Sequence, residues 1–453
     1  MKIALVIHGF PPENLGGSEI YFHHLSRALS VHNRVAVFFR RNNPRDPEYS
    51  LTRKTQGPVE LFALNRTYRD LSDFSNLHDH LRVDQAFSEF IQSWSPEVIH
   101  IGHLHHLSLG IIPQARANHL PLIFTLNDFW LFCPLGQLLT RGLKPCPGPG
   151  PRNCSSCLPD LLLLNPRSFQ GQQLLAKFLP PQKTESAPAR ALISRIYLYL
   201  SRARIRLSPR AARKIQARGE RIAKLLDLVD LFIAPSRFIQ ERFLDFGIPP
   251  AKIIHSDYGF DHEFFSNHSF RKDNCRDFGF VGSFIPSKGL HLLLQAFTSI
   301  RNPGIRLKIF GAFGEPPGYR WKIEKYLFDP RISLENSFPP ENANRVYSQI
   351  DVLVVPSIWP ENSPLVIHEA FLAGIPVIAS RIGGIPELVR EGKNGMLFDP
   401  GNPGDLREKM ELLSHNHEFF SRLKPEPGQV KTIAENAREL EDIYSRLIRK
   451  QSP

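Results

Sequence analysis

Two glutamates stand eight positions apart in the segment PENSPLVIHEA, as Glu361 and Glu369. The first is predicted to lie in a loop after a buried strand, and the second about one turn into a helix that begins near Pro364. The free N–H groups at the start of such a helix, among them those of Ser363 and Leu365, attract an anion. Carboxylates on either side of an anion site suit a ligand that carries both phosphates and hydroxyl groups. On charge spacing alone, two solvated surface carboxylates stay open as the alternative.

The sequence around these glutamates resembles the nucleotide-sugar site of retaining glycosyltransferases of family 4. The motif there is Glu, seven residues, Glu, and here it is followed by AGIPVIAS and GGIPELV. VGSFIPSKG resembles the preceding strand and loop of the family, PPENLGGSE resembles its glycine-rich loop, and YGFD resembles the pattern that enters its second domain. The resemblance covers most of the chain except two insertions, and the order and spacing of the motifs are specific.

The resemblance implies transfer of a sugar from a nucleoside diphosphate sugar to a glycan or lipid-linked acceptor. It implies that Lys288 holds the donor diphosphate and acts in catalysis with Glu361, which would accept hydrogen bonds from sugar hydroxyls. A cation and oriented amides can neutralise the departing phosphate, so no cofactor is expected for catalysis. The implied donor-binding residues are Gly16, Gly17, Ser283, Lys288, Glu361, Asn362, Ser363, Pro364, Leu365 and Glu369, the last through a ribose diol.

Two positions depart from the family pattern. Ser283 stands where the family commonly has an arginine, so one of two cations for the diphosphate is missing. Asn127, in TLND, stands where relatives often have a histidine before the aspartate. A non-transferring enzyme of the same architecture, or a sugar-nucleotide sensor without catalytic activity, therefore stays open as an alternative.

Histidines gather in the segment HIGHLHH, just before Asn127. The resemblance places His100 and His103 beside the cleft, and it implies that His103 and Asn127 contact the acceptor side. We expect no base role for His103, because the leaving phosphate is thought to take the acceptor proton in retaining enzymes of this fold. His105 and His106 are expected on a helix or loop surface.

Four of the five cysteines, Cys133, Cys146, Cys154 and Cys157, lie in a Pro- and Gly-rich insertion at about 133–181. Four thiols with one CxxC pair could hold a structural zinc ion and stiffen a loop that has little core of its own. Unliganded thiols near the acceptor pocket are the alternative.

A second insertion, at about 189–224, holds eleven Arg and Lys residues against the single Glu220. Arginines flank an apolar stripe there, a pattern typical of a helix that lies on an anionic membrane surface. Pro209 is expected to break it into two helices. A solvated face of the domain is the alternative. Nucleic-acid binding is a weaker hypothesis, because no aromatic–basic recognition motif accompanies the arginines.

The elements that must position these residues follow from short apolar runs separated by helical patterns. Runs of this kind are typical of buried parallel strands with helices on both faces. The predicted strands are Lys2–His8, Arg34–Phe39, Val98–Ile101, Leu122–Leu126, Leu231–Ala234, Phe278–Gly282, Arg306–Phe310, Asp351–Val355 and Pro376–Ala379. The fold class is therefore α/β, with two doubly wound Rossmann-like domains facing a central cleft, the GT-B arrangement.

The domain plan has three parts. Residues 1–258 form the acceptor-side domain with both insertions, 259–429 form the nucleotide-sugar domain, and 430–453 form a helix that could pack back on the first domain. The linker is expected near Asp257–Cys275, where polar residues collect without periodicity. A ligand usually binds in the cleft between two such sheets.

Composition excludes several classes of protein. With 42% hydrophobic and 22% charged residues, the chain is neither mostly disordered nor fibrous. The net charge of +12 is local, since residues 189–224 hold +10 of it, which argues against a uniformly basic nucleic-acid binder. No run is long enough to span a membrane, and the N-terminus does not resemble a secretory signal. We expect a cytoplasmic protein, with peripheral attachment to the inner face of the membrane through 189–224 as a further hypothesis.

Overall fold

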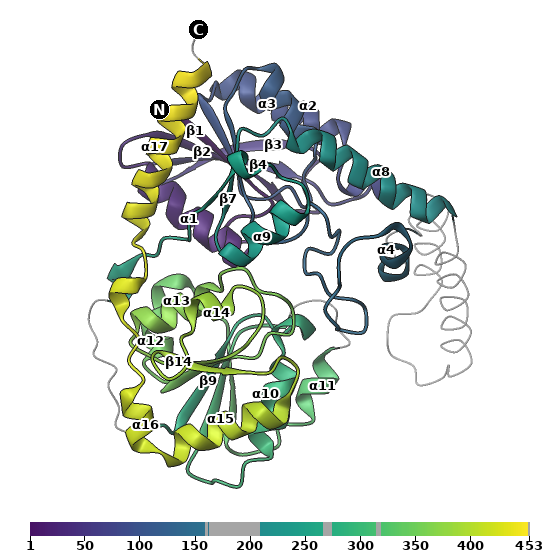
Figure 1. Ribbon diagram of the computed structural model, residues 1–453. Coiled ribbons are helices and arrows are strands. Elements are labelled where there is room, and N and C mark those ends of the chain that lie inside the picture. Colours follow the sequence, from purple (N-terminus) through teal and green to yellow (C-terminus); the bar gives the residue numbers. More distant parts are fainter. Residues whose placement is uncertain (159–161, 163–208, 266–273, 314–318, 452–453) are drawn as a thin grey trace.

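The chain folds into two α/β domains, one above the other in Figure 1. The structure, a computed structural model, describes residues 1–158, 162, 209–265, 274–313 and 319–451. Each domain is built on a largely parallel sheet with helices packed against it. The prediction of two doubly wound Rossmann-like domains is confirmed.

The N-terminal sheet has eight strands. They are β1 (Lys2–Ile7), β2 (Arg34–Arg41), β3 (Leu51–Gln56), β4 (Val59–Asn65), β5 (Val98–Ile101), β6 (Leu122–Thr125), β7 (Leu231–Ala234) and β8 (Ile253–His255). Their order is β3-β4-β2-β1-β5-β6-β7-β8, and only the β3–β4 pair is antiparallel. β1 lies between β2 and β5 and is buried along almost its whole length, as its sequence KIALVI requires.

Six α-helices of the described residues belong to this domain. They are α1 (Gly17–Leu29), α2 (Leu81–Trp94), α3 (Ile111–Ala117), α4 (Pro151–Cys157), α8 (Pro209–Leu226) and α9 (Arg237–Asp245). Gly16 is the N-cap of α1, so the glycine-rich loop leads directly from β1 into that helix. The carboxyl end of β1 and the start of α1 therefore lie together, as in other open α/β sheets.

The C-terminal sheet has six parallel strands in the order β11-β10-β9-β12-β13-β14. They are β9 (Asp277–Val281), β10 (Arg306–Phe310), β11 (Ile332–Glu335), β12 (Val352–Val355), β13 (Val377–Ser380) and β14 (Gly395–Phe398). The helices that follow them are α10 (Leu290–Thr298), α11 (Arg320–Glu324), α12 (Ala343–Tyr347), α13 (Leu365–Leu372), α14 (Ile385–Leu388), α15 (Pro403–His415), α16 (His417–Arg422) and α17 (Ile433–Gln451).

The apolar runs predicted nine of these strands and missed β3, β4, β8, β11 and β14. β3 has the polar sequence LTRKTQ and lies at the edge of its sheet, where one side is open to solvent. β8 has only three residues. β3, β8 and the edge strand β11 bury few side chains, so their sequences carry little apolar signal. This reason does not apply to β4 and β14, which are largely buried.

Two segments cross between the domains, side by side. Phe260 forms a parallel bridge with Thr432, through Phe260 N–H to the Lys431 carbonyl (2.9 Å) and Ile433 N–H to the Phe260 carbonyl (2.7 Å). The first crossing leads into the C-terminal domain, and the second leads back into α17. One hydrophobic core cluster includes buried residues of both domains and of α17, so the crossings are embedded in a shared core.

Helix α17 runs along the N-terminal domain, next to α1 (Figure 1). Tyr21 of α1 donates its hydroxyl hydrogen to Asn436 across 2.7 Å, and the Tyr444 hydroxyl lies 2.6 Å from His100 Nδ1. The C-terminal segment therefore belongs spatially to the N-terminal domain.

Helix α8 is the described part of the basic insertion. Its apolar residues, such as Ile215 and Ile222, are buried against the protein. Arg221 forms an ion pair with Asp79 at 3.1 Å, and Arg218 is buried. This half of the insertion thus covers the domain, and the apolar stripe at 189–208 predicted for membrane contact lies outside the described residues. No helix in the described part of the chain is long and apolar enough to cross a membrane.

Candidate functional site

Lys288 ends the loop that follows β9, immediately before α10. The next residue, Gly289, has a φ of 69° and serves as the N-cap of α10. A Cβ there would lie 1.8 Å from the Pro356 carbonyl oxygen, so only glycine allows this loop to press against the end of β12. The Ile358 N–H donates to the Ser287 carbonyl across 2.9 Å and holds the two loops together.

Glu361 lies in the loop after β12 and meets Lys288. Lys288 Nζ is 2.7 Å from Glu361 Oε1, which also accepts a hydrogen bond from Ser357 Oγ at 2.6 Å. The lysine side chain is 31% exposed and that of the glutamate 4%, so the cation faces the solvent side of the pair. β9 and β12 are neighbours in the sheet, which is why residues 73 positions apart meet at its carboxyl edge.

The glutamate loop is itself held by a glycine. Gly383, with a φ of 62°, passes so close that a Cβ would lie 2.2 Å from the Glu361 carbonyl oxygen. The Gly384 N–H donates to that oxygen across 2.8 Å. The segment GGIPELV therefore packs against the Glu361 backbone and is hydrogen-bonded to it.

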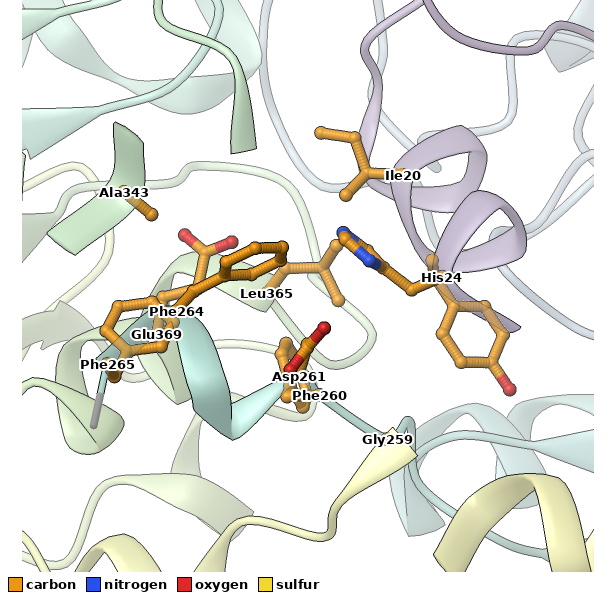
Figure 2. A pocket seen from close by; sticks show the side chains of 11 residues that line it. Ile20, His24, Gly259, Phe260, Asp261, Phe264, Phe265, Ala343, Leu365 and Glu369 are labelled. Atoms are coloured by element: carbon orange, nitrogen blue, oxygen red, sulfur yellow. The ribbon is translucent and has the colours of Figure 1, made fainter. Parts of the chain in front are cut away.

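Glu369 lies on α13, one helical turn after the loop. Tyr347 of α12 donates its hydroxyl hydrogen to Glu369 Oε2 across 2.7 Å. Burial raises the pKa of Glu369, and the hydrogen bond from Tyr347 opposes that shift. The other carboxylate oxygen is left for a ligand, beside Phe264 and Leu365 (Figure 2).

A small pocket that opens to solvent lies between the domains next to Glu369. Its wall is formed by α1, by the segment after the first crossing, and by α12 and α13 (Figure 2). Its lining residues are Ile20, Tyr21, His24, Gly259, Phe260, Asp261, Phe264, Phe265, Ala343, Leu365 and Glu369. A Cβ on Gly17 would lie 3.5 Å from the Leu365 side chain, so the glycine-rich loop reaches the start of α13. The pocket offers a largely apolar, partly aromatic surface with two carboxylates, those of Asp261 and Glu369.

Two of the predicted donor-binding residues, Asn362 and Ser363, form hydrogen bonds with other side chains or backbone groups of the protein. Ser236 donates to the Asn362 side-chain oxygen across 2.7 Å, and the Asn362 amide donates to the Leu126 carbonyl across 3.0 Å. Asn362 thus joins the two domains. Ser363 Oγ lies 2.8 Å from His368 Nε2, and Pro364 is the N-cap of α13.

The other predicted donor-binding residues lie in loops at the cleft. Ser283 is exposed after β9, Gly16 is exposed before α1, and Gly17 is the exposed first residue of that helix. Close to Gly16, the buried Glu19 carboxylate lies 3.1 Å from His8 Nε2. Burial raises the pKa of Glu19, but His8 and nearby hydrogen-bond donors outweigh it and lower the pKa to about 2. The glycine-rich loop is therefore supported by an ionised carboxylate.

His103 and Asn127 lie near each other at the carboxyl ends of β5 and β6. His103 Nε2 is 3.1 Å from Asp128 Oδ1, and His103 Nδ1 accepts a hydrogen bond from the His105 N–H at 2.8 Å. The Asn127 amide donates to the Gly102 carbonyl (2.7 Å), and its oxygen accepts from the Tyr258 hydroxyl (2.6 Å). Both side chains have their polar atoms bound within the protein.

Of the other histidines of HIGHLHH, His100 differs from expectation. His100 is fully buried between Tyr444 and Thr125 (Nε2 to Oγ1 2.7 Å), and burial lowers its pKa to about 3. It is a core residue and does not face the cleft. His105 and His106 lie in the loop after β5, where their rings stack at 3.7 Å and are only half-exposed.

The four cysteines of the first insertion carry free thiols. Cys146 Sγ lies 3.3 Å from the Gly148 carbonyl, and the Gly150 N–H points at Cys154 Sγ across 3.4 Å. Burial raises the pKa of Cys133 and of Cys154. Among the residues that the structure describes, no group of three or more His, Cys, Asp or Glu side chains is arranged to hold a metal ion. The zinc prediction therefore finds no support in this arrangement.

Several residues of the site were not predicted from the sequence, notably Tyr347, His8 and Asp128. His8 and Asp128 directly follow apolar runs, and that position at the carboxyl end of a strand was an available signal. Tyr347 lies on a helix of five residues, and nothing in the sequence pairs it with Glu369.

Comparison with known proteins assigns the second domain. A family model described as "Glycosyl transferases group 1" matches residues 261–429, which hold Lys288, Glu361 and Glu369. A segment of 184 residues is 30% identical to D-inositol 3-phosphate glycosyltransferase of Corynebacterium glutamicum (strain R), covering 38% of this chain and 44% of that protein. The chain thus spans less than half the length of this relative.

Two solved structures are similar over nearly the whole chain. One is sucrose-phosphate synthase from Thermosynechococcus elongatus, with a TM-score of 0.66 and 16% identity over 99% of each chain. The other is Anabaena HepE in complex with UDP and glucose, with a TM-score of 0.61 and 16% identity over 98% of this chain and 99% of that one. At these identities the likeness shows the fold alone. Residues 261–429 thus match the glycosyl transferases group 1 family, in a chain that as a whole has the two-domain GT-B fold.

Proposed function

We propose that the protein is a retaining glycosyltransferase of family 4, which transfers a sugar from a nucleoside diphosphate sugar to a hydroxyl of a glycan or lipid-linked acceptor. The proposal is carried by the ion pair of Lys288 and Glu361 at the carboxyl edge of the C-terminal sheet, which precedes the helix α13 that bears Glu369. The family match supports it. Two solved structures of Anabaena HepE, one in complex with UDP and one in complex with UDP-glucose, support a nucleotide-sugar donor.

When the donor binds, its diphosphate would replace Glu361 as the partner of Lys288. In the structure the lysine ammonium has a carboxylate at 2.7 Å and lies 5.5 Å from the centre of the Trp359 ring. A diphosphate in the cleft replaces the carboxylate as counter-ion. As the bond between sugar and phosphate breaks, negative charge grows on the leaving phosphate, and the fixed ammonium stabilises it.

The two glutamates would bind hydroxyl groups at the two ends of the donor. Once the lysine has turned to the diphosphate, Glu361 accepts hydrogen bonds from the transferred sugar while Ser357 holds its orientation. The free oxygen of Glu369 accepts hydrogen bonds from the ribose diol. The nucleoside then occupies the pocket between Leu365 and the aromatic side chains of Phe264 and Phe265.

Retention follows if the acceptor hydroxyl attacks from the face that the phosphate leaves. The leaving phosphate then receives the acceptor proton, and the new bond between sugar and acceptor oxygen forms on the same face as the old one. His103 is poorly suited to take that proton, because one ring nitrogen accepts from the His105 N–H and the other faces Asp128. This arrangement agrees with a reaction that needs no separate base.

A panel of nucleotides tests the proposal. Purified protein is heated with UDP, GDP, ADP and the corresponding nucleotide sugars, and the melting temperature is recorded. One nucleotide should raise the melting temperature strongly, because a ligand that binds only the folded state stabilises it by mass action. Hydrolysis of the cognate nucleotide sugar, measured next, separates an enzyme from a sensor. A panel without any shift would refute the proposal.

Attachment to a membrane is a separate hypothesis with a separate test. Arg210, Arg213 and Lys224 are exposed on α8 and form no ion pair within the described residues. Each such cation would contribute about 1 kcal/mol near an anionic surface. Vesicles rich in anionic lipid should retain the protein at low salt and release it at high salt. Equal recovery with neutral vesicles would end the hypothesis.

A further inference from the structure

Four neighbouring strands of the N-terminal sheet end in a group of cationic and aromatic side chains. The four strands lie in the order β4-β2-β1-β5. Arg40 is the last residue but one of β2, and Tyr68, His8 and His106 follow the ends of β4, β1 and β5. Each of the four side chains is partly exposed. The carboxyl ends of parallel strands are where open α/β sheets bind ligands, so this group lies at the edge of the sheet where a ligand is expected.

Arg40 differs from the other arginines of its sheet. Its Nε donates to the Arg66 carbonyl across 2.9 Å, and its guanidinium lies 5.2 Å from the centre of the Tyr68 ring. Arg34 and Arg41, on the same strand, pair with Glu60 and Asp46. Within the described residues no carboxylate lies at ion-pair distance from Arg40, and its two terminal nitrogens have no hydrogen-bond partner. A partly buried cation without a counter-ion is costly.

The histidines next to Arg40 supply further donors. The Tyr68 hydroxyl is hydrogen-bonded to His106 Nδ1, which leaves Nε2 of that ring unbonded in the described part of the chain. The His106 ring stacks on His105, and the His8 ring centre is 6.4 Å away. Burial lowers the pKa of both His105 and His106, so they are neutral N–H donors near pH 7.

Two carboxylates, Glu48 and Glu13, attract Arg40 from beyond ion-pair distance within the described residues. Glu48 accepts hydrogen bonds from the Thr67 and Tyr68 N–H groups (2.7 and 3.1 Å). Glu19 is paired with His8, and Asp128 with His103. These strand ends therefore present a forked cation and imidazole donors, and within the described residues no carboxylate, Glu13 included, is paired with Arg40.

We propose that the acceptor carries an anionic group, a phosphate or a carboxylate, which binds to Arg40 and His106. A guanidinium can donate two parallel hydrogen bonds to either group, and such charge-assisted pairs are strong and directional. The inference rests on the proposed transferase function and adds the chemical class of its acceptor. Because the anionic group and the reacting hydroxyl lie a fixed distance apart in the acceptor, binding of the anionic group would also place the hydroxyl.

Binding of simple anions tests this inference. The protein is first saturated with the nucleotide that stabilises it most, so that the diphosphate site is filled. Inorganic phosphate, acetate and uncharged glycerol are then titrated at constant ionic strength, and the melting temperature is followed. Phosphate, acetate or both should stabilise the wild type, and glycerol should not. The stronger anion identifies the group.

Arg40→Gln should weaken anion binding about 10- to 100-fold, the range of a charged hydrogen bond. Arg34→Gln, at the other end of the same strand, is the matched control and should bind like the wild type. Arg40→Lys keeps the positive charge but loses the two parallel N–H donors of the guanidinium. Its anion affinity should lie between those of the wild type and of Arg40→Gln, and it replaces Arg40→Gln in the test if that variant does not fold. Anion binding that is absent in the wild type, or unchanged in the Arg40 variants, overturns the inference. A nucleotide shift retained in every variant shows that the transferase proposal stands independently.

Discussion

Lys288 and Glu361 form an ion pair of 2.7 Å that connects the loops after two adjacent strands of the C-terminal sheet. In the proposed reaction Lys288 would bind the diphosphate and Glu361 the transferred sugar, so the two residues in contact would act on either side of the bond that breaks.

Replacing Lys288 with Ala should abolish most sugar transfer. The ammonium is the charge that stabilises the leaving phosphate, and removal of one such group typically lowers the rate about 10²- to 10³-fold. Initial rates with the cognate nucleotide sugar measure the effect. Lys54→Ala, an exposed lysine on edge strand β3, is the control. Wild-type rates in the Lys288 variant would contradict the assigned role.

Tyr347→Phe should move the pH dependence of nucleotide binding. Burial raises the pKa of Glu369, and the Tyr347 hydrogen bond lowers it, so loss of that bond raises the pKa further. Ribose hydroxyls donate to the ionised carboxylate, so affinity falls as the pH drops through this pKa. In the variant, that fall should begin at a higher pH. Nucleotide titrations at several pH values, with Tyr326→Phe as control, provide the test; superimposable profiles would argue against the role of Glu369.

Asn362→Ala should loosen the connection between the domains. The change leaves the Ser236 hydroxyl and the Leu126 carbonyl without their partner in a buried place, at about 1–3 kcal/mol. A fall in melting temperature, larger than for an exposed Asn118→Ala variant, is expected. If stability is unchanged and only donor affinity drops, Asn362 acts as a donor ligand, as its sequence position suggested.

Glu19→Gln should lower stability most at neutral pH. The folded pKa of about 2 lies below the usual value of 4.5, so the ionised carboxylate stabilises the fold above pH 4.5. That contribution, about 3 kcal/mol from the shift, is lost as the pH falls from 4.5 toward 2. The difference in unfolding free energy between wild type and variant should therefore shrink from pH 7 to pH 3. If this free-energy difference is the same at pH 7 and pH 3, the effect of Glu19→Gln comes from packing and not from the charge of the carboxylate.

Chelation should leave transfer intact. In the proposed reaction Lys288 supplies the positive charge at the diphosphate, so a divalent ion is not required there. Rates in 5 mM EDTA, a concentration of about the usual order for chelation, should match those in buffer alone. Loss of activity that returns with added Mg²⁺ would place a metal ion in the reaction.

The fold could be predicted because buried parallel strands leave a signal in the sequence. Runs such as KIALVI and DVLVV are apolar on both faces of the strand. Strands have this pattern when helices cover both faces of their sheet. The order of these runs with helices between them determined the two-domain plan. The edge strand β3 was missed because solvent covers one of its sides and its residues are polar.

The sequence by itself determined the residue types of the site, namely Lys288 and the Glu361/Glu369 pair on a loop and a helix. Only the tertiary structure decided which polar atoms face the cleft. It turned the Asn362 and Asn127 side chains toward partners inside the protein and buried His100 under Tyr444. The physical reason is that a hydrogen bond depends on side chains meeting in space, and residues 344 positions apart, such as His100 and Tyr444, leave no mark of their pairing in a single sequence.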